Sequence, residues 1–230
     1  MISRRNFTKL SAAALGGLVV SGCAEWEASP LLRGQHLVDE SVATIERFQT
    51  IEGLQRFSEF LPDAVGLMIF PRILKAGLFV GGEGGNGILM ARTPAGGWSA
   101  PAFYSMGTGS FGLQIGAQDT EMILVIRNQG AVDAVLKDQA KFGADAGFTA
   151  GIYGVGAEAS TTTNLGVDVL AFTNSRLGGY IGVSVEGAII ARRQDLNEAI
   201  YGVGMTPDKI VSDPSAQMAR AERLKNALGN

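Results

Sequence analysis

Five basic residues stand where apolar runs turn or end in the middle and late parts of the chain. Arg72 and Lys75 flank one apolar turn, Arg92 ends the next apolar run, and Arg192 and Arg193 form a pair. Cationic side chains that share a surface attract phosphate groups. We therefore predict that these five contact anionic headgroups. The alternative, that they are solvated strand ends, is the one that composition alone favours.

Residues for catalysis or metal binding are scarce. With one Cys and one His, the chain lacks the usual ligand sets for zinc, and a catalytic Ser–His or Cys–His pair would need His36. His36 falls on the polar side of a predicted helix, where a solvated imidazole is expected. Glu186 interrupts an apolar strand, and we expect a structural pairing with Arg192 or Arg193. We predict no catalytic residue, no metal and no cofactor.

A glycine-rich motif in residues 82–87 formally fits the dinucleotide-binding pattern G-x-G-x-x-G. That function needs a helix to open at the last glycine, so that its free N–H groups face the pyrophosphate. The following residues, Ile88, Leu89 and Met90, are instead typical of a strand. We interpret the motif as a glycine hairpin.

The N-terminus has the layout of an export signal in residues 1–22. Arg4 and Arg5 resemble the twin-arginine motif, and an apolar run that is too short to span a bilayer follows them. Cys23, the only Cys, stands where a bacterial lipobox places its acylated residue. We predict a lipoprotein of the bacterial cell envelope that faces the periplasm. Ala24 after the Cys, in place of an Asp, favours the outer membrane.

Processing at this site would also change the charge of the protein. Residues 1–22 carry three of the 19 basic residues and none of the 22 acidic ones, so the rest of the chain has a formal charge of −6. Proteins that bind polyanions normally carry a basic excess. We therefore expect no nucleic-acid partner.

The elements that must position these residues are helical at both ends and β in the middle. Residues 34–50 show helical periodicity, and this helix either binds a membrane interface or packs onto the domain. Short apolar runs separated by Gly and Pro follow, and the chain has 32 glycines. Further helices are expected over 129–142 and 214–228. The fold class is α+β, with a strongly coiled, Gly-rich, mainly antiparallel sheet or a barrel-like core.

Three stretches together resemble the SYLF domain, a lipid-binding module. They are VGLMIFPRILKAGLFVGGEGGNGILMAR, GGWSAPAFYSMGTGSFGLQIGAQDTEMILVI and GGYIGVSVEGAIIARRQDLNEAIYG. The motifs K-A-G, W-S-x-P and S-V-E-G make the likeness specific. The expected organisation is an export signal (1–22), a lipidated Cys with its tether (23–33) and a single SYLF-like domain (34–230).

The resemblance implies a non-enzymatic function. Eukaryotic members are similar in binding phosphoinositides through an N-terminal amphipathic helix and basic residues, and yeast relatives also bind actin and carry an SH3 domain. We find no SH3 domain here and expect no actin partner, because an exported lipoprotein would not meet actin. The leading hypothesis is a lipid-anchored envelope protein that binds membrane phospholipid. The alternative is an envelope scaffold that binds another protein or its own copies.

Overall fold

The computed structural model describes residues 28–77, 80–111, 116–137, 139–141, 150–154, 168–177 and 188–229. The predicted export signal, with Arg4 and Arg5, lies outside the described residues. Cys23 and Glu186 also lie outside them. Their predicted roles therefore stay predictions.

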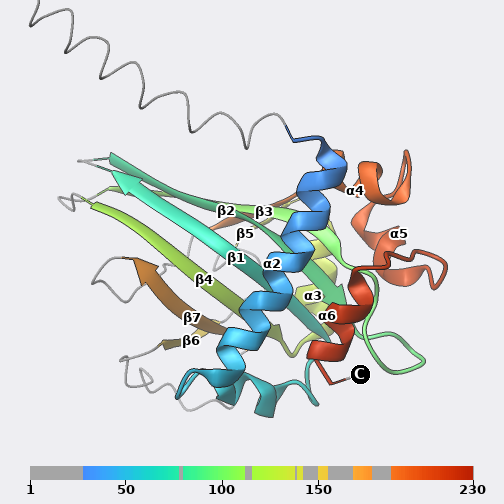
Figure 1. Ribbon diagram of the computed structural model, residues 1–230, viewed down its shortest axis with the longest axis horizontal. Coiled ribbons are helices and arrows are strands. Elements are labelled where there is room, and N and C mark those ends of the chain that lie inside the picture. The colour runs from blue at the N-terminus through green and yellow to red at the C-terminus, as the bar shows by residue number, and fades with distance from the viewer. Residues whose placement is uncertain are drawn as a thin grey trace, which may run out of the picture.

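The first described helix, α2 (Pro30–Thr50), begins four residues before the predicted start. Ser29 caps it, because its Oγ accepts a hydrogen bond from Leu32 N at 3.3 Å, and proline suits the first helical turn. Val38, Ile45 and Phe48 on its apolar side are fully buried. This side packs on the sheet, with η2 (Gln55–Phe60) beyond the end of the helix (Figure 1). Of the two predicted roles for the amphipathic helix, the structure shows packing onto the domain.

Eight strands form one sheet in the order β5-β8-β3-β2-β1-β4-β7-β6. Their bounds are β1 Gly66–Gly77, β2 Val80–Ala91, β3 Ala102–Phe111, β4 Gly116–Ile126, β5 Gln139–Lys141, β6 Ala150–Gly154, β7 Val169–Leu177 and β8 Ile189–Arg192. Neighbouring strands pair antiparallel except β6 and β7, which are parallel. The predicted α+β fold with a mainly antiparallel sheet is confirmed. The barrel-like alternative is wrong, because β5 and β6 remain the two edges of the sheet within the described residues.

The glycine motif of residues 82–87 lies inside β2, so its interpretation as a hairpin is wrong. β1 bulges between Ile69 and Arg72, where Pro71 has no N–H to donate to the ladder. The bulge presses on β2: a Cβ at Gly85 would lie 2.1 Å from the Arg72 carbonyl oxygen, and one at Gly87 2.5 Å from that of Ile69. These two glycines therefore serve close backbone approach rather than a turn.

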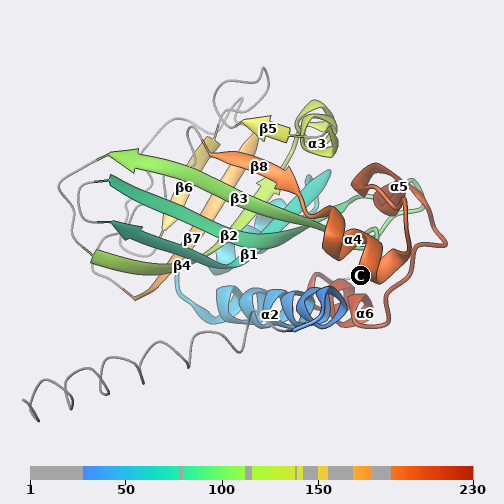
Figure 2. The same ribbon diagram turned by 90° about the horizontal axis from the view of Figure 1, so that it is seen from above.

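Helices cover both faces of the sheet (Figure 2). One face carries α2, η2 and α6 (Ala221–Ala227), and the other carries α3 (Gln129–Leu136) and α5 (Pro207–Ser212). The predicted helices 129–142 and 214–228 are shorter here, at Gln129–Leu136 and Ala221–Ala227. Within the described ranges, none of the helices is both long and apolar enough to cross a membrane.

A buried amide fixes the remaining helix, α4 (Gln194–Tyr201), to the sheet. Asn197 Oδ1 accepts a hydrogen bond from Phe103 N at 2.8 Å, and Asn197 Nδ2 donates to Phe103 O at 3.2 Å. Both backbone groups lie on β3, and Asn197 is completely buried. This pairing holds α4 beside the start of α2, where Arg33 reaches Asp195.

Candidate functional site

The first turn of α2 exposes apolar side chains beside α4. Leu31 and Leu32 are 43% and 57% exposed, and Val203, just after α4, is 94% exposed. Gly34 brings the two helices together, because its Cβ position lies 3.1 Å from the Ile200 side chain. We call this end of the domain the α2–α4 tip (Leu31, Leu32, Arg33, Arg193, Asp195 and Val203). Figure 1 shows the start of α2 beside α4.

Two arginines and one carboxylate form the polar part of the tip. Arg193 donates to both oxygens of Asp195, at 2.8 Å from Nε and 2.7 Å from Nη2, and Arg33 Nη2 lies 3.4 Å from Asp195 Oδ2. The hydrogen bonds from Arg193 lower the pKa of Asp195, and the same pairing raises the pKa of Arg193. Asp195 is therefore ionised at neutral pH, and the three side chains leave one net positive charge.

A second polar cluster is built around Glu121 on β4, which is completely buried. Its carboxylate accepts hydrogen bonds from Arg47 and Thr44 of α2 and from Asn174 of β7, and Arg176 Nη1 lies 3.8 Å from Glu121 Oε1. Hydrogen bonding to Glu121 raises the pKa of Arg47. The cluster therefore ties the second half of α2 to two neighbouring strands.

Arg72, one of the predicted phosphate ligands, lies beside this cluster on the same face of the sheet. Its Nε is 3.3 Å from Asp119 Oδ2, and half of its side chain is exposed. Asp119 is 8% exposed, and among the described residues its Oδ1 has no hydrogen-bond partner. Arg72 thus has a structural carboxylate partner and keeps an exposed guanidinium.

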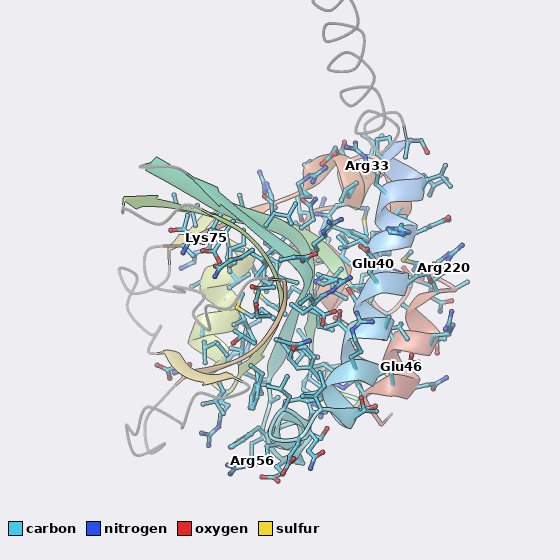
Figure 3. All side chains as sticks on the ribbon, turned by 60° about the vertical axis from the view of Figure 1, so that its left-hand side comes forward. Arg33, Glu40, Glu46, Arg56, Lys75 and Arg220 are labelled. Atoms are coloured by element: carbon cyan, nitrogen blue, oxygen red, sulfur yellow. The ribbon has the colours of Figure 1, made fainter. Side chains whose placement is uncertain are left out.

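Lys75 and Arg192 lie on the other face, which Figure 3 shows for Lys75. Lys75 Nζ is 3.9 Å from Glu83 Oε2, and Glu83 is only 6% exposed. Burial raises the pKa of Glu83, and Lys75 partly offsets that rise. Arg192 lies on β8, where it pairs with Tyr104 of β3. β8 is three strands away from β1, or about 14 Å at the usual strand spacing. The two side chains share a face but do not meet.

Arg92, just after β2, binds the segment that precedes β1. Its Nε and Nη2 donate to the carbonyl oxygens of Ala64 and Leu61, at 3.2 and 2.8 Å. Its guanidinium stacks over Trp98, with Cζ 4.0 Å from the ring centroid. The five predicted basic residues are therefore distributed over both faces and two ends, with Arg193 alone in the tip.

Sequence reasoning missed the apolar part of the tip, because it assigned residues 31–33 to the tether. The signal was present in the sequence: Pro30, Leu31, Leu32 and Arg33 place a helix start and two leucines next to a base. No group of three or more His, Cys, Asp or Glu side chains that could hold a metal occurs in the described part of the chain.

The segment 107–230 matches the family described as "Ysc84: Las17-binding protein actin regulator". The chain belongs to the Ysc84 family. This membership confirms the predicted SYLF resemblance. The Ysc84 match covers β3 from its middle onward, the later strands and the C-terminal helices.

Curated relatives of this Ysc84-family chain are eukaryotic and longer. It is 32% identical over 172 residues to SH3 domain-containing protein PJ696.02 of Schizosaccharomyces pombe, covering 74% of this chain and 40% of the relative. It is 33% identical over 156 residues to LAS seventeen-binding protein 3 of Saccharomyces cerevisiae, covering 67% and 34%. SH3 domain-containing YSC84-like protein 1 of Homo sapiens is 30% identical over 166 residues, covering 72% and 48%. The chain therefore spans less than half the length of these relatives.

These names overturn one expectation. Actin was not expected as a partner because an exported protein would not meet it, and the exported location is itself a prediction. The Ysc84 family is described as an actin regulator, and relatives are named for binding Las17. Family membership thus supports a protein-interaction or actin-regulatory module, and the exclusion of actin is withdrawn.

Proposed function

We propose that this Ysc84-family domain is a non-enzymatic binding module that contacts phospholipid surfaces with its α2–α4 tip. The observation that carries the proposal is the exposure of Leu31, Leu32 and Val203 beside Arg33 and Arg193. Apolar side chains that enter the acyl boundary, with bases at headgroup level, are the two contributions that hold peripheral proteins on anionic membranes. The −6 charge of the chain after residue 22 opposes such binding elsewhere.

The predicted anchor is in the right place for this function. Six residues, 24–29, separate Cys23 from Pro30, and they span at most about 20 Å when extended. An acylated Cys23 would keep the tip within that distance of the bilayer. The proposed location is the periplasmic side of the bacterial outer membrane.

Vesicle flotation tests the proposal with full-length Cys23→Ser protein, which removes the anchor. We expect flotation with vesicles of phosphatidylcholine containing phosphatidylglycerol or cardiolipin, and much less with phosphatidylcholine alone. Leu31→Asp combined with Val203→Asp should reduce the floated fraction at least fivefold.

Arg56→Glu in η2 is the matched control, because it changes the net charge by the same amount and lies beyond the opposite end of α2 (Figure 3). Equal loss of flotation in both variants would indicate that the net charge of the protein, and not the tip, controls binding. Failure of the Cys23→Ser protein to float would refute the tip as a lipid-binding surface.

The names of the relatives favour a second function, the binding of a protein partner such as Las17 or actin. A groove of about 820 Å³ between α2, η2 and α6 offers a place for it, lined in part by Glu46, Arg92 and Arg223. Co-sedimentation with polymerised actin tests this function. Binding that is lost in Arg223→Glu and kept in Leu31→Asp would support the groove. No sedimentation with actin and no capture by purified Las17 would refute it.

A further inference from the structure

In the described part of the chain, half of one sheet face has no helix over it. α2 packs over the ends of the strands that carry Ile69, Ile88 and Ile123, and the opposite ends of β1 to β4 extend beyond it (Figure 1). On the face that α2 covers, one row of paired residues crosses this bare part. Following the strand pairings, the row is Asp119, Leu74, Gly84, Gly107 and Ile189. We call it the bare row.

Apart from Asp119 at one end, the bare row is apolar, and its centre has no side chains. Leu74 is 49% exposed and Ile189 45%, and the two glycines lie between them. A Cβ at Gly107 would meet nothing closer than 3.9 Å. In the next row, Gly82 and Gly109 have open space at their Cβ positions. Unlike Gly85, Gly107 is therefore not needed for internal packing, and it leaves the sheet backbone accessible from outside.

One end of the bare row carries charge without full pairing. Asp119 Oδ1 is buried and has no partner among the described residues, although its other oxygen meets Arg72. Arg72 and Arg176 are each about half exposed beside it. Whatever covers the row would need apolar contacts along most of its length and an acidic group next to these arginines.

The depth of this surface excludes a flat membrane as the occupant. α2 stands beside the bare row on the same face, and a helix with its side chains is about 10 Å thick. A bilayer that rested on α2 would therefore remain one helix diameter above Leu74. A helix of the same thickness would fill the space level with α2.

We infer that the occupant is α2 of a second copy of this chain. The outward side of α2 presents, in order along its axis, Leu32, His36, Ala43 and Glu46, and Asp39 between them is held by Arg220 of the same copy. Leu32 and Glu46 are 14 residues apart, or about 21 Å along the helix. Ile189 and Asp119 stand four strands apart, or about 19 Å. The two spacings differ by about 2 Å, which is less than the rise of two helical residues.

The chemistry matches in the same register. Leu32 of the second copy packs on Ile189, and Glu46 lies next to Arg72 and Arg176, which neutralise it. His36, whose side chain is 66% exposed, stands over the open glycine at position 107. In each copy, the bare row lies beside α2. A twofold axis parallel to α2 therefore places α2 of each copy on the bare row of the other.

Sedimentation equilibrium of the full chain carrying Cys23→Ser, measured from 1 to 100 µM, tests the inference. We expect a monomer–dimer equilibrium. Gly107→Trp should yield monomer throughout, because its indole fills the space of the second α2 without touching the fold. Glu46→Arg should raise the dimer dissociation constant at least tenfold, through repulsion from Arg72 and Arg176.

Asp133→Arg on α3 is the control, since it makes the same charge reversal on the opposite face of the sheet (Figure 2). It should leave the dissociation constant unchanged. Unchanged circular dichroism and urea midpoint in Gly107→Trp would confirm that the variant is folded. A monomeric parent protein at 100 µM would overturn the inference, and so would a dimer that persists in folded Gly107→Trp.

Discussion

Replacement of Gly85 by alanine should destabilise the fold strongly, because the β1 bulge occupies the space that a side chain would need. The new methyl carbon would lie 2.1 Å from the Arg72 carbonyl oxygen and 3.2 Å from Ile73 Cα. Ordinary contact between carbon and oxygen begins near 3.3 Å, so that the two strands must separate by about 1 Å. Both atoms belong to the backbone of a hydrogen-bonded ladder and cannot rotate away.

The expected loss of free energy of unfolding follows from these contacts. Overpacking of a well-packed site costs about 1–3 kcal/mol, and each ladder hydrogen bond that lengthens costs about 1 kcal/mol more. We expect Gly85→Ala to lower the free energy of unfolding by about 3 kcal/mol. Gly82→Ala is the matched control in the same strand: with nothing within 4 Å, it should raise the free energy of unfolding by about 0.5 kcal/mol through the unfolded state.

Urea denaturation followed by circular dichroism measures both variants. With a slope of about 2 kcal/mol per M urea, the two midpoints should differ by between about 1.5 and 2 M, at equal slopes. A Gly85→Ala protein within about 0.5 kcal/mol of the parent would refute the argument, because it would mean that β1 does not press on β2 as described.

Three further substitutions test the polar contacts in the same urea assay. Glu83→Gln should stabilise the fold at pH 7. The folded-state pKa of Glu83 is raised, so the ionised form weakens folding, and the gain should disappear as the pH falls below about 4.5; a gain that is independent of pH would contradict this origin. Asn197→Ala should cost about 2–3 kcal/mol, because the Phe103 N–H and C=O lose their buried partner; a loss under 1 kcal/mol would show that the amide is not the clamp. Arg47→Met should cost about 2–3 kcal/mol by leaving the Glu121 charge with weaker partners, and a loss under 1 kcal/mol would show that this pair does not hold α2 on the strands.

The predictable part of this structure is the part that depends on local pattern. The periodicity of residues 34–50 identified the buried side of α2, because residues three and four apart share a helix face whatever lies opposite. The alternation and the glycine content indicated a coiled antiparallel sheet in the same way. The family resemblance was also readable, since its motifs are short and contiguous.

The sites were not predictable because they depend on strand register. Arg72 meets Asp119, 47 positions away, and Arg47 meets Glu121 across 74 positions. A shift of one residue in either pairing would move these side chains to the other face. Arg72 and Lys75 were expected to converge because a turn was predicted between them, but both lie in the continuous strand β1, where residues three apart face opposite sides of the sheet.

The two proposed surfaces constrain each other through α2. A twofold axis parallel to this helix makes the two α2 helices run in the same direction, so that both α2–α4 tips lie at the same end of the dimer. Both copies could then meet one membrane, and the second contact would form at the high effective concentration set by the first. Leu31 and Val203 remain available for that contact while Leu32 packs on Ile189 of the other copy. A dimer with antiparallel α2 helices would instead place the two tips at opposite ends. The parallel arrangement therefore connects dimer formation to the strength of membrane binding.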